Sequence, residues 1–387
     1  MRSREFPIIV SGMVAGDPDQ GGAAWAVLQY VLGLQRMGHD VYLFEPVSPG
    51  AIKPIGSPLD CSENAAYFRA VTAAFGLQDR SSMLVEETGQ SVGLPESEVR
   101  GICAKAAVLI NISGMLQRED LISRIPIRIY LDLDPGFNQL WHATQGIDMR
   151  FDAHNHFVTV GNSLGKPDCP IPTCGIEWTA TLQPVVLDYC SPAEPIRHDG
   201  FTTIANWRGY GSIEFDGVFY GQKAHSLRKF ISLPTRTAEE FMLALTIHPD
   251  ERKDLTTLFE NGWRLLNPAC VAKTPQQYIS FISGSKAEFG IAKSGYVAAR
   301  CGWFSDRSAS YLACGRPVLA QETGFSSYLP CGEGLFPFSS IDNALQAVDS
   351  INRDYKRHST AARRIALEYF ESGKVLSRLL RTVGLYS

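Results

Sequence analysis

The feature that most constrains the fold is an alternation of short apolar strands and amphipathic helical segments that occurs twice along the chain. An apolar run at 6–10 is followed by a glycine-containing loop, a helical pattern from Ala24 to Gln35 and a second apolar run at 41–44. Further apolar runs follow at 105–114, 127–135 and 156–163. Because strand–helix–strand units build parallel sheets, this pattern predicts an α/β fold made of doubly wound, Rossmann-like sheets.

The strand–helix series begins again in the second half. The stretch PVVLDYCSPAEP at 184–195 has the composition of a linker, and the apolar strand FTTIANW starts at Phe201. A chain of 387 residues is long for one core and suits two domains of roughly 150 to 200 residues each. We therefore expect an N-terminal α/β domain at 1–195 and a second α/β domain from residue 196. Two such domains facing one another leave a cleft at the carboxyl ends of their strands.

Composition excludes several classes of protein. The apolar fraction of 45% and the charged fraction of 20% are those of an ordinary globular protein. The net charge of −4 offers no global attraction to nucleic acid or to anionic membranes, which disfavours nucleic acid as a partner. The nine cysteines are odd in number and scattered, as reduced thiols usually are, and their spacing predicts no metal site. No signal segment or long apolar run is present, so we expect a cytoplasmic protein without a transmembrane segment.

Common nucleotide and hydrolase motifs are also missing. The stretch GYGSIE at Gly209 has Glu214 in place of the third glycine of a dinucleotide fingerprint, and GVFYGQK does not have the spacing of a phosphate-binding P-loop. No GxSxG elbow occurs. The pair Asp132 and Asp134 follows a buried strand on alternating faces, which favours a turn at Asp134 over a metal site. Asp134 ends a strand at the cleft, where it could bind an acceptor or act as a base.

Two segments of the first half carry candidate acceptor-binding residues. The loop SGMVAGDPDQGG ends in Gly21 and Gly22 just before a helix, where backbone amides can approach a ligand closely, and Asp19 could contact acceptor hydroxyls. A tight turn that lets helix and strand pack explains the same residues without a ligand. His156, at the start of a strand, is a further candidate, although buried or capping histidines are common.

The segment FSDRSASYLACG at 304–315 predicts a short helix with Ser305 or Asp306 at its amino end and Gly315 at its carboxyl end. The free N–H groups at this amino end, with Arg307 beside them, suit a diphosphate. Small residues that include Ser308 and Ser310 let the helix lie close to a sheet. The strand RPVLAQ follows, and then the loop of Glu322, Thr323 and Gly324 offers further backbone near the same cleft.

These residues carry a resemblance to a known family. The Gly-Gly pair before the first helix, GHDVYLF after it, and ACGRPVLA followed by TG resemble a GT-B glycosyltransferase of the retaining, family-four type. DRSASYLACG is also similar to a bacterial spore-protein glycosyltransferase-like group. The resemblance implies a C-terminal nucleotide-sugar-binding domain at 196–365 and a last helix at 366–387 that crosses back onto the N-terminal, acceptor-side domain. From the apolar periodicity, we expect the final helical segment to run from about 358 to 380.

The resemblance also implies roles for individual residues. The family binds the donor diphosphate with a basic residue after the first strand of the second half and a later lysine, positions matched here by Arg208 and Lys223, with Arg307 as a third candidate. The glutamate that binds the nucleotide ribose in the family is Ser310 here, and a second family glutamate falls at Gly302. Asp306, Glu288 or Glu322 could supply the missing carboxylate.

The expected function is the transfer of a sugar from a nucleotide-diphosphate donor to a small-molecule, glycan or protein acceptor. By resemblance, we expect retention at the anomeric carbon and neither a metal nor another bound cofactor. Two alternatives stay open. The chain could be an inactive pseudoenzyme that recognises a sugar nucleotide or a glycan, or it could be a sugar-nucleotide epimerase with the same two-domain architecture.

Overall fold

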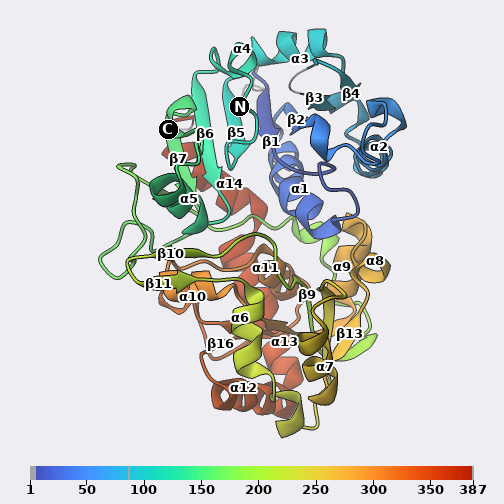
Figure 1. The fold of residues 1–387 in the computed structure, drawn as a ribbon, viewed down its shortest axis with the longest axis vertical. Helices are drawn as coiled ribbons and strands as arrows, with labels where there is room; N and C mark the ends of the chain where they lie inside the picture. Colours follow the sequence, from blue (N-terminus) through green and yellow to red (C-terminus); the bar gives the residue numbers. More distant parts are fainter. Residues whose placement is uncertain (1–5, 86–87, 386–387) are drawn as a thin grey trace.

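The computed structural model describes residues 6–85 and 88–385 and contains two α/β domains stacked along the long axis of the molecule (Figure 1). Each domain is built around a mainly parallel sheet. The strands are nearly continuous apolar runs because helices cover both faces of such sheets. The predicted fold class, two doubly wound Rossmann-like domains, is confirmed.

The N-terminal sheet has eight strands, and β1 lies near its middle. All neighbours are parallel except β3 and β4, which are antiparallel. In spatial order the strands are β4 (Ser91–Gly93), β3 (Ser81–Val85), β2 (Val41–Val47), β1 (Ile8–Ser11), β5 (Val108–Ile112), β6 (Ile127–Asp132), β7 (His156–Thr159) and β8 (Thr179–Ala180). The connecting helices are α1 (Gly21–Arg36), α2 (Glu63–Ala74), α3 (Glu96–Cys103), α4 (Glu119–Ile122) and α5 (Phe137–Gln145).

The C-terminal sheet has six strands that all pair in parallel. Their order is β13 (Arg264–Leu266), β12 (Phe241–Thr246), β9 (His198–Asn206), β14 (Ser285–Gly290), β15 (Val318–Gln321) and β16 (Leu335–Phe338). A separate antiparallel hairpin joins β10 (Ile213–Phe215) and β11 (Val218–Tyr220). The helices are α6 (Lys223–Leu227), α7 (Arg252–Glu260), α8 (Pro268–Val271), α9 (Pro275–Ser283), α10 (Ser294–Ala299), α11 (Asp306–Ala313) and α12 (Ile341–Arg353).

The C-terminal segment returns to the first domain, as expected, but it is not one helix. Helix α13 (Tyr355–Ile365) passes through a π-helical turn at Ala366–Phe370 and ends before α14 (Ser372–Thr382). The break lies at Glu371, whose carboxylate caps α14 by accepting hydrogen bonds from the N–H groups of Gly373 (2.7 Å) and Lys374 (2.9 Å). The predicted continuous helix over 358–380 is therefore wrong, because apolar periodicity alone does not reveal this cap.

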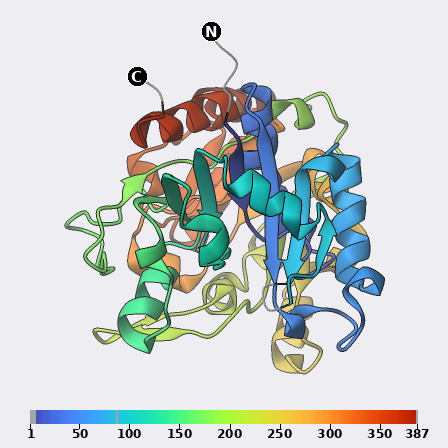
Figure 2. The same ribbon diagram turned by 90° about the horizontal axis from the view of Figure 1, so that it is seen from above.

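Helix α14 packs across α1 of the N-terminal domain, at the red end of the chain in Figure 2. The approach is close at Gly33, where an added Cβ would lie 2.6 Å from Leu376 Cδ1. No helix in the described part of the chain is long and apolar enough to cross a membrane.

Candidate functional site

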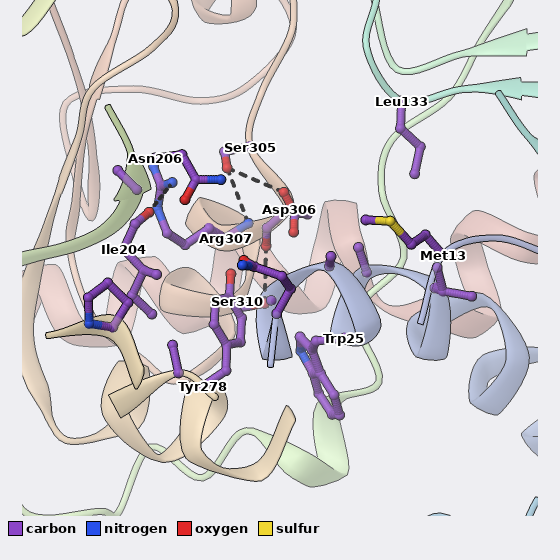
Figure 3. A pocket seen from close by; sticks show the side chains of 18 of the residues that line it. Met13, Trp25, Leu133, Ile204, Asn206, Tyr278, Ser305, Asp306, Arg307 and Ser310 are labelled. Atoms are coloured by element: carbon purple, nitrogen blue, oxygen red, sulfur yellow. Dashed lines mark hydrogen bonds between the residues drawn. The ribbon is translucent and has the colours of Figure 1, made fainter. Parts of the chain in front are cut away.

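A cavity of about 830 Å³ lies between the two domains, at the carboxyl ends of strands from both sheets. The N-terminal domain lines it with the segment after β1, the start of α1 and the residues that follow β5 and β6. The C-terminal domain contributes the end of β12. It also contributes the end of β9, with Ile204 and Asn206, and the start of α11, with Asp306 (Figure 3). The cavity is therefore at the place where facing parallel sheets are expected to bind ligands.

Helix α11 presents its amino end to this cavity. Ser305 is the N-cap, and its Oγ accepts a hydrogen bond from the Arg307 N–H at 3.2 Å. Asp306 and Ser310 lie one turn apart on the same face and both line the cavity. The predicted helix start is confirmed, and the helix ends at Ala313, two residues before the left-handed Gly315.

Arg307 lines the cavity but is largely buried. Its guanidinium donates to Glu288 Oε1 from Nε (2.6 Å) and to the Ile204 carbonyl from Nη1 (2.9 Å), and both charged side chains are almost fully buried. Burial raises the pKa of Glu288, although Arg307 opposes this shift. Ser308 is buried on the other side of the helix and does not line the main cavity. The positive charge of Arg307 is thus largely neutralised by its ion pair with Glu288.

Lys223 is the cation best placed to meet an anionic ligand. It is the first residue of α6, lines the cavity and is partly buried. Within the described residues, no carboxylate oxygen lies within 4.0 Å of its Nζ. Burial, together with the nearby charges of Arg307 and Lys293, lowers the pKa of Lys223 to about 7. An incoming anion would favour its protonated form.

A cluster around Asp134 joins the two domains at the cavity. Its carboxylate accepts from Lys293 Nζ at 3.0 Å and from the hydroxyls of Tyr210 and Tyr296, and all three donors belong to the C-terminal domain. Burial lowers the pKa of Lys293, and Asp134 opposes this shift. The Asp134 carboxylate is therefore fully engaged as an interdomain acceptor, and it could act as a base only if this cluster opened.

Asp132 lies beneath this cluster and is completely buried. It accepts hydrogen bonds from Asn138 Nδ2 (2.7 Å), Gln139 Nε2 (2.9 Å) and Thr159 Oγ1 (2.8 Å). Burial raises its pKa to about 6. Asp132 thus fixes the turn that leads to Asp134. Among residues 6–85 and 88–385, no three His, Cys, Asp or Glu side chains gather as metal ligands would.

Several residues that the sequence suggested lie away from the cavity. Arg208 points outward and pairs with Glu251 (Nε–Oε1 2.6 Å), and His156 starts β7 outside the cavity lining. Glu322 accepts from the Gly324 N–H at 2.5 Å, and the Thr323 hydroxyl donates to the Trp303 carbonyl. The loop of Glu322, Thr323 and Gly324 therefore supports the backbone at 300–303 and does not line the cavity.

The loop before α1 is already occupied by a carboxylate of the protein. Glu45 of β2 is completely buried, and its Oε1 accepts from the N–H groups of Val14 (2.8 Å), Ala15 (2.8 Å) and Gly16 (2.6 Å). Burial raises the pKa of Glu45 to about 7, although these three amides oppose the shift. The N–H groups of Val14, Ala15 and Gly16 therefore bind the Glu45 carboxylate and are not free to bind a ligand.

Gly21 and Gly22 serve close packing between the domains. An added Cβ on Gly21 would lie 2.3 Å from the Thr274 carbonyl oxygen, and one on Gly22 would lie 2.8 Å from the Tyr278 ring. Gly22 and Asp19 also line the cavity, and Asp19 pairs with Lys273 of the second domain at 3.0 Å. The turn-and-packing interpretation of this loop thus accounts for both glycines.

Sequence reasoning missed Glu45, Lys293, Tyr210 and Tyr296. Glu45 carried one usable signal, since it is a single acidic residue within the apolar strand 41–47, and a buried carboxylate needs several donors. The other three are joined to Asp134 by contacts between segments 76 to 162 residues apart. Spacing along the chain does not reveal such contacts.

Comparison with solved structures finds glycosyltransferases that have the same architecture. An alpha-glucosyltransferase in complex with UDP-glucose and DNA containing an abasic site matches with a TM-score of 0.60 and 10% identity over 98% of each chain. HepE from Anabaena, in complex with UDP, matches with a TM-score of 0.55 and 10% identity over 98% of this chain and 100% of HepE. Sucrose-phosphate synthase from Thermosynechococcus elongatus matches with a TM-score of 0.55 and 11% identity, over 99% and 100% of the two chains.

At the level of sequence, no family model and no curated protein matches the chain. The structural matches nevertheless extend over nearly the full length of both chains in each comparison. Coverage of 98% or more of this chain means that both domains lie within the matched region. The chain therefore has the GT-B fold that these glycosyltransferases share.

Proposed function

We propose that this protein is a glycosyltransferase that moves a sugar from a nucleotide-diphosphate donor to an acceptor bound by the N-terminal domain. The observation that carries the proposal is the cavity between the two domains, where Lys223 and the amino end of α11 face the same space. The structural neighbours solved with UDP or UDP-glucose support this donor class.

Lys223 and the N–H groups at the start of α11 would bind the donor diphosphate. As the bond between the anomeric carbon and the phosphate oxygen breaks, negative charge grows on the departing diphosphate. A lysine and a helix amino end stabilise that charge, and in a site shielded from water this contributes several kcal/mol. Arg307, locked to Glu288, would act by orienting α11 rather than by touching the phosphates.

We further propose that the transfer retains the anomeric configuration and needs no metal. The acceptor oxygen would approach on the face that the diphosphate leaves, forming the new bond to the anomeric carbon while its proton passes to the departing phosphate oxygen. Such a reaction asks the protein mainly for positioning and for stabilisation of the leaving group. It does not require Asp134 as a base, in keeping with the saturation of that carboxylate by three donors.

The proposal is tested by isothermal calorimetry with UDP, ADP, GDP and dTDP, with and without magnesium, followed by donor turnover with the matching glucose conjugate. Binding of one nucleotide without magnesium, together with slow hydrolysis of its sugar conjugate, is the expected result. The Lys223→Met variant should lose about tenfold in affinity, whereas Arg208→Met should bind as the wild type does. Binding without any turnover would favour the pseudoenzyme, which the serine at position 310 makes the second candidate.

A further inference from the structure

The N-terminal domain supplies the cavity with a wall that is apolar where it is open to a ligand. This apolar wall consists of four residues that line the cavity and are only partly buried: Met13, Ala26, Met115 and Leu133. Met13, Met115 and Leu133 directly follow the strands β1, β5 and β6, which are neighbours in the sheet, and Ala26 lies on α1. The wall therefore runs along the carboxyl edge of three adjacent strands.

The side chains of the apolar wall are accessible from the cavity. Among the described residues, Met13 and Met115 are not part of the buried apolar cluster to which Val27 and Ile112 belong. A single exposed apolar residue is ordinary, but several that line one concave surface are typical of a ligand site. Covering them removes apolar surface from water, and the flexible thioether side chains of methionine can adapt to the shape of the ligand.

Charge is distributed unevenly around the cavity. Its three cationic residues, Lys223, Lys293 and Arg307, all belong to the C-terminal domain. In the described part of the N-terminal domain, no lysine, arginine or histidine lines the cavity. The charged groups on that side are the carboxylates of Asp19 and Asp134, and both are paired with lysines of the other domain. An anionic ligand on this side would lose its hydration without gaining an ion partner.

The apolar wall faces the proposed donor site. Figure 3 shows Met13 and Leu133 on the opposite side of the pocket from Ile204 and Asn206, with Asp306 between the two sides. Because Asp306 starts α11, a molecule on the wall would hold a hydroxyl beside the helix end that is proposed to bind the diphosphate. The cavity of about 830 Å³ is also within the range of roughly 300–1,000 Å³ that is usual for small-molecule sites.

We infer that the acceptor is an uncharged small molecule with an aromatic or alkyl body, which Met13, Ala26, Met115 and Leu133 bind. Its hydroxyl oxygen would form the new bond to the anomeric carbon while the bond from that carbon to the diphosphate oxygen breaks, and its proton would pass to the departing diphosphate. This inference rests on the proposed glycosyltransferase function. It distinguishes the acceptor from a free saccharide, a sugar phosphate and DNA.

The test is ligand-observed NMR on the full-length protein, with and without UDP. The probes are phenol, 4-propylphenol and 2-naphthol, then glucose and maltose, and finally glucose 6-phosphate and a short DNA duplex. Because affinity should increase with the apolar area that is covered, 2-naphthol should bind more tightly than phenol and roughly tenfold more tightly than glucose. If a sugar, a sugar phosphate or DNA binds as tightly as 2-naphthol, or if no phenol binds, the inference is wrong.

Polar substitutions of similar shape make the test residue-specific. Met13→Gln and Leu133→Asn should each weaken 2-naphthol binding roughly five- to tenfold and leave UDP affinity unchanged. Met13→Leu should bind 2-naphthol as the wild type does, because it keeps the apolar surface. Met37→Gln is the matched control, since Met37 is also partly buried but lies outside the cavity lining. Equal 2-naphthol affinity in Met13→Gln and Met37→Gln would overturn the assignment of the wall.

The same measurements separate this inference from the proposed function. If the wild type binds 2-naphthol but no nucleoside diphosphate, the apolar ligand site stands and the glycosyltransferase proposal fails. If the wild type binds UDP and prefers glucose to 2-naphthol, the glycosyltransferase proposal stands and the apolar acceptor is ruled out.

Discussion

The carboxylate of Asp134, just past the end of strand β6, lies 3.0 Å from the ammonium nitrogen of Lys293 in the opposite domain. The hydroxyls of Tyr210 and Tyr296 complete the shell around this carboxylate. Their rings pack against Phe137 of α5, at centroid distances of 4.9 Å for Tyr210 and 5.6 Å for Tyr296. The two domains are therefore held together on this side by a charge pair within an aromatic cluster.

Asp134→Asn should loosen this interdomain contact. Removing one partner of a fully buried ion pair costs about 3–5 kcal/mol, but these side chains are 22% and 16% exposed, so we expect a loss of about 1–3 kcal/mol. Urea unfolding measures this loss, and small-angle scattering should show a larger radius of gyration. Arg208→Met is the control, since it breaks an exposed pair with Glu251 and should cost about 0–1 kcal/mol. Equal losses in both variants would refute the special role of Asp134.

Lys223 should make nucleotide binding depend on pH. Its folded-state pKa is about 7, so above this pH the free site must take up a proton to hold a diphosphate with an ammonium group. UDP affinity should therefore fall as pH rises from about 6 to about 8.5, and calorimetry in two buffers at pH 8 should record proton uptake on binding. Lys223→Met should lack both effects. If the wild type and Lys223→Met bind UDP with the same affinity at every pH, the assignment of Lys223 to the diphosphate site is wrong.

The same lysine predicts a change in stability at alkaline pH. The pKa of Lys223 lies below the value of about 10.5 that a solvated lysine has, so the unfolded chain binds more protons between about pH 7 and about pH 10.5. The free energy of unfolding of the wild type should rise over this range relative to that of Lys223→Met. Urea unfolding of both proteins at three pH values in this range measures the change. If the difference between their free energies of unfolding does not vary with pH, the pKa of Lys223 is not depressed.

Glu45 should contribute a pH dependence in the acidic range. Its folded-state pKa of about 7 lies above the ordinary value of 4.5, so the folded chain keeps a proton that the unfolded chain has lost between these two pH values. Wild-type stability should fall, relative to Glu45→Gln, as pH rises from about 4.5 to about 7. The exposed Glu98 provides a control in Glu98→Gln, which should follow the wild type. Parallel curves for all three proteins would show that Glu45 does not titrate in this range.

The strands and the start of α11 could be predicted from sequence because their signals are local. Apolar runs mark strands buried on both faces, and Ser305 followed by Asp306 is a standard amino-terminal cap. The directions of the charged side chains could not be predicted in this way. Arg307 turns inward because Glu288, nineteen residues earlier, lies beside it on β14, and Arg208 turns outward to Glu251, 43 residues later. The site thus depends on contacts that only the register of the strands and the packing of the domains determine.

Gly21 should be intolerant of even one added carbon atom. Its N–H donates to the Ala272 carbonyl at 3.0 Å, and a Cβ would lie 2.3 Å from the Thr274 carbonyl oxygen. Both neighbours are backbone atoms of the other domain, which cannot move aside without separating α1 from α8 and α9. Gly21→Ala should therefore cost about 1–3 kcal/mol, and it should also weaken UDP binding because the cavity lies between the same two domains.

Gly101 provides the matched comparison for Gly21. It lies in the exposed part of α3, where an added Cβ meets nothing within 4 Å. Gly101→Ala should leave UDP affinity unchanged and stabilise the protein by about 0.4–1 kcal/mol, because alanine is the better helix former. Thermal unfolding and calorimetry on the two variants separate the effects. If Gly21→Ala keeps both the stability and the UDP affinity of the wild type, the close approach of the domains at α1 is not needed for binding.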